Sequence, residues 1–346
     1  MLGSRRTPRA MSLSTGVSNT TVCASHKKLR KRCAGQNSYG ASSGSLAQQS
    51  LATYCANTDI DIIPMAFLYQ ITSGTGGQPV LNFANQENDC TTFSGTELID
   101  CPNIGADITT CQKTYGKTIL LSVGGATYTE GGFTSEAAAV AAAKDLWNMF
   151  GPEQWGSSTP RPFGSAVIDG FDFDFETSVT NTVAFANELR SLFATDTSKK
   201  YYLTAAPQCP YPDAADNSML SGGVHFDAIF VQFYNNYCGL QSYVAGAANE
   251  WNFNFDQWDT WAQNVSANPD VKVLLGVPGD TSAAGSGYEP LSVLQPILEY
   301  CKQFDSFGGV MVWDASQAYA NAGFLAGVKS CLTSSAKMIR GMRWRF

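Results

Sequence analysis

The sequence predicts an α/β protein, a (β/α)8 barrel of the TIM type. Short apolar or β-branched runs alternate with helix-like stretches, which is the pattern of parallel strands joined by crossover helices. Seven strand runs can be identified, and one more helix-like stretch precedes them without a good strand of its own. Eight strand–helix units with one damaged strand fit a closed barrel better than an open sheet.

The predicted strands are short and largely apolar, as expected for strands that are covered on both faces. They span residues 61–68, 118–123, 167–175, 201–205, 228–233, 271–276 and 308–313. Helix-like segments span residues 43–55, 135–150, 179–193, 290–304 and 315–329. The connection at 277–290 is too short to contain an additional subdomain.

The first strand should lie just before Gly35, where the sequence is cationic. Five of the eight residues at 27–34 are lysine or arginine, and burying an unpaired cation costs several kcal/mol. We therefore expect a degraded first strand. Residues 1–34 would be an aberrant basic N-terminus outside the folded core, 35–332 the barrel domain, and 333–346 a basic tail.

The net charge of -7 conceals a strongly acidic central region. Twelve of the 22 basic residues lie in the two terminal segments, so 10 remain against all 29 acidic residues, a balance of about -19. Such a surface repels nucleic acid and anionic lipid and favours a neutral or cationic substrate. No stretch approaches the roughly 20 apolar residues of a membrane span. We expect neither a nucleic-acid nor a membrane partner.

The chain contains ten cysteines, which favour an oxidising compartment. Eight of them lie within residues 55–331, at spacings that form no paired CxxC zinc cluster. Buried thiols in a cytosolic protein are the alternative. The even number favours disulfides and a secreted, extracellular protein, although residues 1–34 contain no apolar run that could act as a signal peptide.

The segment 169–176 reads DGFDFDFE and concentrates acidic residues. Because side chains alternate along a strand, its phenylalanines should point to one face and its acids to the other. The inward acids would be Asp172, Asp174 and Glu176. A solvated edge strand is the alternative, but parallel strands are covered on both faces. Clustered acids without a cation share protons, which raises at least one pKa as a general acid requires.

The sequence contains few of the residues that other catalytic mechanisms require. The chain has two histidines, His26 and His225, too few for a Ser-His-Asp, Cys-His or histidine-based metal site. The chemistry should therefore depend on carboxylates, with no metal and no cofactor.

Four motifs resemble those of glycoside hydrolase family 18. They are SVGG at 122–125, DGFDFDFE at 169–176, QFYN at 232–235 and GVMVW at 309–313. Together with AAPQCP at 205–210, they are similar to the plant and fungal class III, hevamine-like endochitinases.

The resemblance implies an endochitinase that hydrolyses internal β-1,4-N-acetylglucosamine linkages of chitin. Glu176 would protonate the glycosidic oxygen, Asp174 would orient the N-acetyl group, and Asp172 would share a proton with Asp174. Tyr234 would hydrogen-bond the acetamide, whose oxygen acts as the nucleophile, so that configuration is retained. The partner would be chitin or chito-oligosaccharides, bound by a monomer.

Further positions are predicted to bind the substrate. Trp313 would form the floor under a sugar ring. The others are Gln232, Gly125, Gln36, Asn37 and Phe67. Trp258 and Trp261, three residues apart, favour the buried stripe of a helix over a sugar platform.

The resemblance also implies disulfides. The implied bridges are Cys55–Cys111, Cys90–Cys101 and Cys209–Cys238, with Cys301–Cys331 left by exclusion.

Two other functions remain open on this fold. One is a non-catalytic lectin or inhibitor, because a fold does not imply a function. Such proteins typically lack the acid at the position of Glu176. The other is an endo-β-N-acetylglucosaminidase that cuts the core of N-glycans with the same residues.

Overall fold

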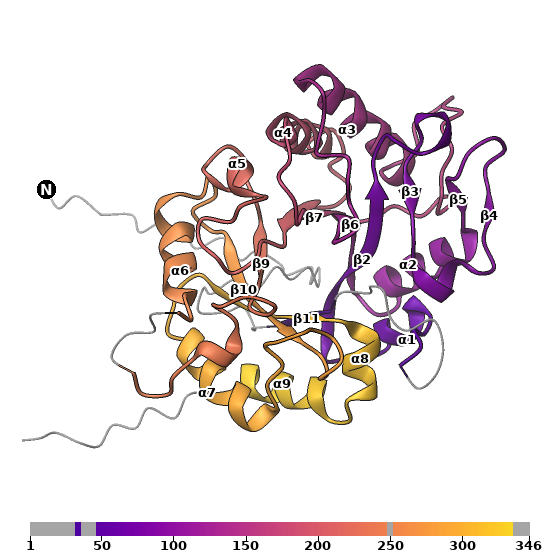
Figure 1. The fold of residues 1–346 in the computed structure, drawn as a ribbon. Helices are drawn as coiled ribbons and strands as arrows, with labels where there is room; N and C mark the ends of the chain where they lie inside the picture. The colour runs from indigo at the N-terminus through magenta and orange to yellow at the C-terminus, as the bar shows by residue number, and fades with distance from the viewer. Residues whose placement is uncertain (1–31, 36–45, 248–251, 335–346) are drawn as a thin grey trace, which may run out of the picture.

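The computed structural model describes residues 32–35, 46–247 and 252–334, which form a closed parallel barrel with helices around it (Figure 1). The barrel strands follow one another in the order β1-β11-β10-β9-β8-β7-β6-β2, and β1 also pairs with β2, which closes the sheet. They are β1 (Arg32–Gly35), β2 (Ile60–Gln70), β6 (Thr118–Gly124), β7 (Gly170–Asp174), β8 (Tyr202–Ala205), β9 (Ala228–Gln232), β10 (Lys272–Pro278) and β11 (Phe307–Trp313). The predicted (β/α)8 barrel is confirmed.

Short strands and nine α-helices complete the described structure. Strand β3 (Val80–Leu81) pairs antiparallel with β2, and β4 (Thr91–Thr92) pairs with β5 (Ile99–Asp100). The helices are α1 (Leu51–Cys55), α2 (Pro102–Lys113), α3 (Glu136–Phe150), α4 (Thr182–Phe193), α5 (Asn217–Leu220), α6 (Phe255–Asn264), α7 (Leu291–Cys301), α8 (Ala315–Ala320) and α9 (Phe324–Thr333).

The helices differ from the predicted segments in two places. The helix expected at 43–55 begins only at Leu51 within the described residues. The segment expected at 315–329 is divided into α8 and α9, because Gly323 adopts a left-handed conformation with φ of 81° and starts a new helix. Helices α2 and α5 lie between predicted strands, where the alternation implies helices but no residue range was predicted.

Strand β1 occupies the first position of the barrel, between β2 and β11. Its four residues pair in parallel with 309–312 of β11. Of the five cations at 27–34, only Arg32 lies in β1, and main-chain hydrogen bonds depend little on side-chain polarity, so this segment can pair there. The boundary expected at Gly35 falls at the end of this strand, whereas 1–31 and 335–346 lie outside the described residues.

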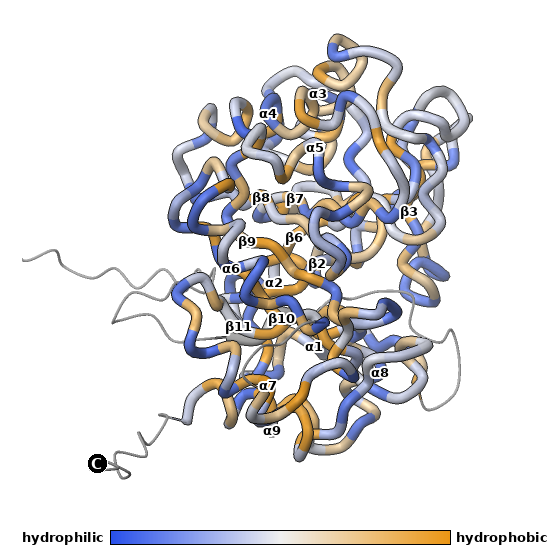
Figure 2. The backbone as a smooth tube through the Cα atoms, turned by 60° about the vertical axis from the view of Figure 1, so that its left-hand side comes forward, coloured by the Kyte–Doolittle hydropathy of each residue, from blue (hydrophilic) through white to orange (hydrophobic). Residues whose placement is uncertain are grey.

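The buried apolar side chains form two clusters, one on each face of the barrel sheet. The larger one lies between sheet and helices and contains Phe171, Phe173 and Phe175. The smaller one contains alternate strand residues such as Phe230 and Met311, and lies inside the barrel. Strands β9, β10 and β11 are accordingly hydrophobic over much of their length (Figure 2). The phenylalanines of β7 therefore face the helices, as their alternation predicted.

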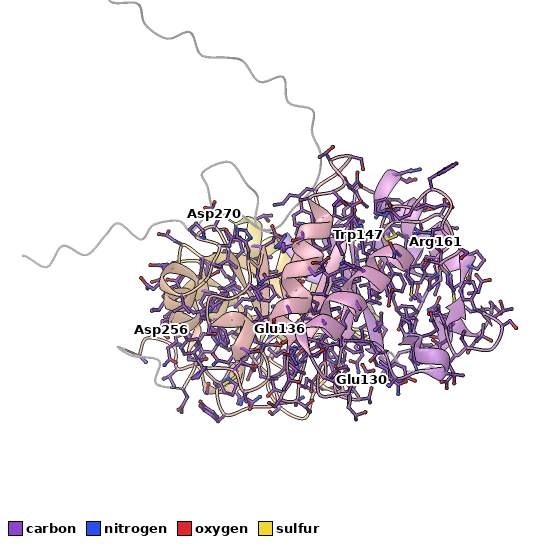
Figure 3. All side chains as sticks on the ribbon, turned by 90° about the horizontal axis from the view of Figure 1, so that it is seen from above. Glu130, Glu136, Trp147, Arg161, Asp256 and Asp270 are labelled. Atoms are coloured by element: carbon purple, nitrogen blue, oxygen red, sulfur yellow. A yellow bond between two sulfur atoms is a disulfide. The ribbon has the colours of Figure 1, made fainter. Side chains whose placement is uncertain are left out.

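Arg161 fixes the loop that leads from α3 into β7. Its guanidinium donates to the carbonyl oxygens of Asn148 at 2.8 Å, Gly151 at 2.7 Å and Gly164 at 2.9 Å. It lies beside the Trp147 end of α3 (Figure 3). Burial lowers the pKa of this guanidinium, and the charge of Glu153 opposes that change. The carbonyl acceptors offset the cost of removing the cation from water. The entry of the chain into β7 is thereby held in one conformation.

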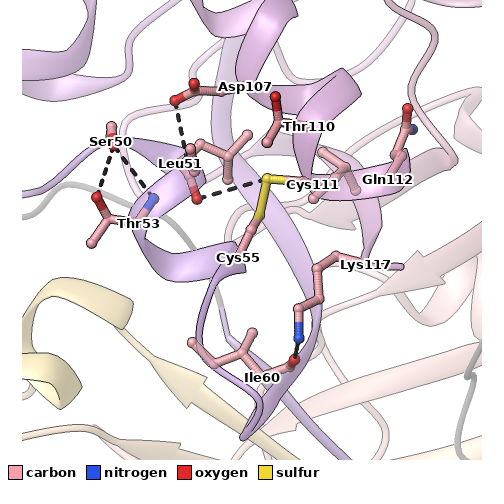
Figure 4. The surroundings of a disulfide bond; sticks show 12 residues. Ser50, Leu51, Thr53, Cys55, Ile60, Asp107, Thr110, Cys111, Gln112 and Lys117 are labelled. Atoms are coloured by element: carbon pink, nitrogen blue, oxygen red, sulfur yellow. Dashed lines mark hydrogen bonds between the residues drawn. A yellow bond between two sulfur atoms is a disulfide. The ribbon is translucent and has the colours of Figure 1, made fainter. Parts of the chain in front are cut away.

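Three disulfides join loops and helices around the barrel. Cys55–Cys111 joins α1 to α2, beside the Ser50 side chain that caps α1 (Figure 4). The bridges Cys90–Cys101 and Cys209–Cys238 are formed as well.

The fourth expected bridge, Cys301–Cys331, is not formed. That pairing came from exclusion alone, without a geometric requirement that the two thiols meet. The ends of α7 and α9 are joined in another way, because the Lys302 ammonium donates to the carbonyl oxygen of Cys331. Burial raises the pKa of the Cys331 thiol, which keeps it protonated.

Among the described residues, no helix has the length and apolar character that crossing a membrane would require.

Gly170 is expected to tolerate no side chain. It has φ of 143°, and a Cβ there would lie 1.9 Å from the carbonyl oxygen of Tyr202 on β8. Gly170→Ala should therefore lower the free energy of unfolding by about 3 kcal/mol or more, measured by urea unfolding. The matched control is Gly131→Ala, because Gly131 also has positive φ but nothing within 4 Å, and should cost about 1 to 2 kcal/mol. Equal losses in the two variants would contradict this account of β7.

Candidate active site

Asp172 is held by its two neighbouring strands. It lies in the middle of β7, where its register partners are Ser122 on β6 and Thr204 on β8. Both hydroxyls donate to its carboxylate, Ser122 Oγ at 2.8 Å and Thr204 Oγ1 at 2.5 Å. The Asp172 carboxylate is therefore held in one orientation inside the barrel by the two neighbouring strands.

Asp174 ends β7 and is 2% exposed. Its Oδ1 accepts a 2.8 Å hydrogen bond from Nε2 of Gln232, which also donates to the carbonyl oxygen of Ala206 at 2.9 Å. Burial raises the pKa of Asp174 well above its usual range, and the charges of Glu176 and Asp172 act in the same direction. The Gln232 hydrogen bond opposes this rise in pKa. Asp174 is therefore a carboxyl group that takes up a proton readily.

Glu176 lies two residues beyond β7 and is half-buried. Burial raises the pKa of its carboxyl group, and the charge of Asp213 raises it further. A carboxyl group with a raised pKa at the carboxyl end of a barrel strand has the properties of a general acid.

Tyr234 lies two residues beyond β9 and is 5% exposed. It packs in the cluster inside the barrel, against which Trp313 also packs. Burial raises the pKa of its phenol well above the usual value, and the charges of Asp174 and Glu176 raise it further. The hydroxyl therefore stays protonated and can donate a hydrogen bond.

A pair of stacked aromatic rings lies near the carboxyl end of β7. The rings of Phe67 and Trp313 are stacked, with centroids 5.9 Å apart and planes at 29°. Gly125 has φ of 84°, and a Cβ there would lie 2.8 Å from the Phe67 ring. Its N–H donates to the carbonyl oxygen of Asp174 at 2.6 Å. The structure thus brings Gly125, Phe67 and Trp313 together beside β7, while Gln36 and Asn37 lie outside the described residues.

The two helical tryptophans belong to the core, as their spacing predicted. Trp258 and Trp261 are buried on α6. Their indole N–H groups donate to the carbonyl oxygens of Cys209 and Leu220. Among the described residues, no group of three or more His, Cys, Asp or Glu is placed to hold a metal ion.

Two acids near the site were missed from the sequence. Asp213 and Asp216 lie in the loop between β8 and α5, and both are buried. Both lie in an irregular loop outside any strand or helix, so no strand or helix pattern in the sequence marks them as part of the site. Ser122 and Thr204 were missed as partners of Asp172 because only strand register brings them together.

Comparisons with known proteins agree with this geometry. Residues 49–285 match the family model described as glycosyl hydrolases family 18. The class III chitinase of Arthroderma benhamiae is 55% identical over 284 residues, covering 82% of this chain and 86% of that protein. Endochitinase 33 of Trichoderma harzianum is 48% identical over 299 residues, covering 86% and 89%.

Solved structures share the fold. The xylanase and α-amylase inhibitor protein XAIP-II of Scadoxus multiflorus superposes with a TM-score of 0.68 at 29% identity, covering 86% of this chain and 97% of that one. ICChI chitinase of Ipomoea carnea gives a TM-score of 0.68 at 27% identity, covering 87% and 99%. The chain is therefore a glycoside hydrolase, and it belongs to glycosyl hydrolases family 18.

Proposed function

We propose that this glycoside hydrolase cuts internal β-1,4 linkages between the N-acetylglucosamine units of chitin and retains the anomeric configuration. The observation that carries the proposal is Asp174, a buried carboxyl group whose pKa is raised and which interacts electrostatically with both Glu176 and Tyr234. The chitinase names of the most similar curated relatives support the substrate.

The first half of the reaction uses Glu176 as general acid. Its raised pKa keeps the proton available, and that proton passes to the glycosidic oxygen as the bond to the anomeric carbon breaks. The acetamide oxygen of the same sugar forms the new bond to the anomeric carbon, which gives an oxazolinium ion. Asp174 accepts from the acetamide N–H, and the Tyr234 hydroxyl donates to the acetamide oxygen.

The second half reverses these roles. Glu176, now ionised, takes a proton from water as the water oxygen attacks the anomeric carbon from the face that the leaving group left. The bond between the anomeric carbon and the acetamide oxygen breaks in this step, which restores the N-acetyl group. Two displacements at one carbon give net retention. Asp172 supports both steps because its charge helps to raise the pKa of Asp174, so that the two carboxyl groups can share a proton.

The burial of Asp174 supports substrate assistance over a carboxylate nucleophile. Its side chain is held by Gln232 inside the barrel rather than projecting from it. A sugar carrying an acetamide can supply the nucleophile itself, so no second exposed carboxylate is needed.

The connection between β10 and α7 supports cleavage within the polymer. The chain passes from Pro278 to Leu291 without an intervening helix or strand. No subdomain is inserted there to wall the substrate groove, so a long chain can lie across the barrel end. We further infer an extracellular monomer, which the three disulfides suit.

A non-catalytic role is the competing function, because XAIP-II is an inhibitor on this fold. A turnover assay on soluble chito-oligosaccharides separates the two, since a binding protein releases no product. Release of a high-mannose glycan from a glycoprotein would instead favour an endo-β-N-acetylglucosaminidase.

Glu176→Gln is expected to lower kcat on a chito-oligosaccharide by at least about a hundredfold, because the amide cannot protonate the leaving oxygen. Glu136→Gln, on the exposed first turn of α3 (Figure 3), is the matched control and should leave kcat unchanged. Turnover of Glu176→Gln within a few-fold of the unmodified protein would refute the assignment of the acid.

Asp174→Asn is expected to lower kcat by about a hundredfold as well, although Asp174 never contacts the scissile oxygen. The amide can still accept from Gln232, but it cannot take up a proton or carry the charge that stabilises the oxazolinium ion. Asp256→Asn, exposed on α6, controls for an unspecific effect of losing an aspartate. A loss below about fivefold would mean that the acetamide is not the nucleophile.

Retention itself can be measured directly. Proton NMR of a chito-oligosaccharide digest, recorded before mutarotation, should show the β-anomer as the first product because two displacements occur at the anomeric carbon. An initial α-anomer would require a single displacement by water and would exclude this mechanism.

A further inference from the structure

Glu176 lies in a short loop rather than in a strand or a helix. Strand β7 ends at Asp174 and helix α4 begins at Thr182, so residues 175–181 connect the two. A general acid transfers its proton only when it lies within hydrogen-bond reach of the leaving oxygen. A displacement of about 1 Å can lower a rate by about a hundredfold, so this loop has to be held in place for catalysis.

The loop between β6 and α3, residues 125–135, contacts the end of β7. The N–H of Gly125 donates to the carbonyl oxygen of Asp174 at 2.6 Å. A Cβ at Gly124 would lie 2.5 Å from the same oxygen and 3.2 Å from Cδ1 of Phe175. The two chain segments are therefore in contact where the Glu176 loop begins.

Tyr128 extends this contact to the residue that directly precedes Glu176. Its side chain is 1% exposed, and its ring packs against that of Phe175 with centroids 5.0 Å apart. The hydroxyl oxygen of Tyr128 accepts from the N–H of Gly132 at 3.1 Å. Close packing of two buried rings leaves Phe175 one position, and Glu176 is bonded to it.

Thr180 joins the far end of the Glu176 loop to the same β6–α3 loop. Thr180 forms a parallel β-bridge with Gly132. Its N–H donates to the carbonyl oxygen of Gly131 at 3.1 Å, and its carbonyl oxygen accepts from the N–H of Phe133 at 2.9 Å. The Thr180 hydroxyl also lies 3.1 Å from the carbonyl oxygens of Gly131 and Phe133. Both ends of the segment that carries Glu176 are thus attached to one neighbouring loop.

We propose that the β6–α3 loop positions the general acid, with Tyr128 at one end of residues 175–180 and Thr180 at the other holding Glu176 where it reaches the glycosidic oxygen. Tyr128 and Thr180 are positioning residues, because they act through Glu176 rather than on the sugar. This inference rests on the proposed role of Glu176 as general acid.

The leaving group distinguishes positioning of the acid from support of the fold. A sugar hydroxyl is a weak acid, so its oxygen must be protonated as the glycosidic bond breaks, whereas para-nitrophenol is acidic enough to leave with little help. The test therefore measures kcat/KM on a soluble chito-oligosaccharide and on para-nitrophenyl diacetylchitobioside, the aryl substrate. A misplaced Glu176 lowers the first value more than the second. A loss of folded protein lowers both by the same factor.

Two variants remove the two attachments. Tyr128→Leu deletes the ring that packs on Phe175, and should lower kcat/KM on the oligosaccharide about tenfold more than on the aryl substrate. Thr180→Val deletes the bridging hydroxyl, and should give a difference of about threefold between the substrates. Tyr128→Phe keeps the ring and is the conservative rescue, with a difference below about twofold.

Tyr201→Leu is the matched control for a cavity in the core. Tyr201 is also a buried tyrosine, with its ring 4.9 Å from that of Trp147, but it directly precedes β8 at the opposite end of the barrel. Its loss should lower the two kcat/KM values by the same factor. Glu176→Gln lacks the acid itself and should show the largest difference between the substrates.

Each outcome decides the proposal. A larger loss on the oligosaccharide in both Tyr128→Leu and Thr180→Val, but not in Tyr201→Leu, supports it. Equal losses on the two substrates in either variant overturn it and leave the proposed function standing when Glu176→Gln discriminates between them. Discrimination by Tyr201→Leu also overturns it, because any loss of core packing would then have this effect. A Glu176→Gln variant that does not discriminate removes the proposed function itself.

Folding is measured beside activity by thermal unfolding, because Tyr128 is buried. Thr180 is exposed, and valine is close to threonine in size, so Thr180→Val leaves the packing of the core unchanged. If Tyr128→Leu does not fold, Thr180→Val decides alone: a larger loss on the oligosaccharide supports the proposal, and equal losses overturn it.

Discussion

Asp174 carries a carboxyl group in a place where water cannot hydrate its charge. The free-energy cost of burying that charge determines how the surrounding groups interact with it. Burial is the largest cause of the raised pKa at Asp174, Glu176 and Tyr234 alike. An unpaired buried charge costs several kcal/mol, so the site holds protons where a solvated cluster of acids would release them. Gln232 supplies the donor that keeps Asp174 in one orientation.

Strand β7 holds these acids inside the barrel because the side chains on its opposite face pack against the helices. Phe171 and Phe173 belong to the core between sheet and helices, while Asp172 and Asp174 alternate with them into the barrel. Gly170 lets the strand approach Tyr202 closely enough for this register. Packing outside the barrel and chemistry inside it are therefore set by one five-residue strand.

Features that repeat along the sequence, such as strands and their two faces, could be predicted. Features that depend on strand register or on main-chain hydrogen bonds could not. The alternation of apolar runs with helix-like stretches predicted seven of the barrel strands. The alternation of phenylalanine with acidic residues predicted the two faces of β7. Cationic side chains before Gly35 suggested a missing first strand, yet main-chain pairing forms β1 regardless. Asp213 is placed by its own loop's N–H groups and by a bridge from Gln208 to Gln232, and neither leaves a pattern in the sequence.

The charged groups at the two ends of the barrel differ: one end contains ion pairs and the other contains the acids of the candidate site. At the amino-terminal ends of the strands, acids are paired with cations: Lys199 with Asp169 at 2.8 Å, and Arg190 with Asp227 at 2.5 Å. At the carboxyl-terminal ends, the charges that shift the pKa of Glu176 and Asp174 are all acidic. In the proposed mechanism, a cation there would favour ionised Glu176 and remove the proton that it donates. Lys199 and Arg190 form their ion pairs at the opposite end of the barrel, where they do not act against the proposed general acid.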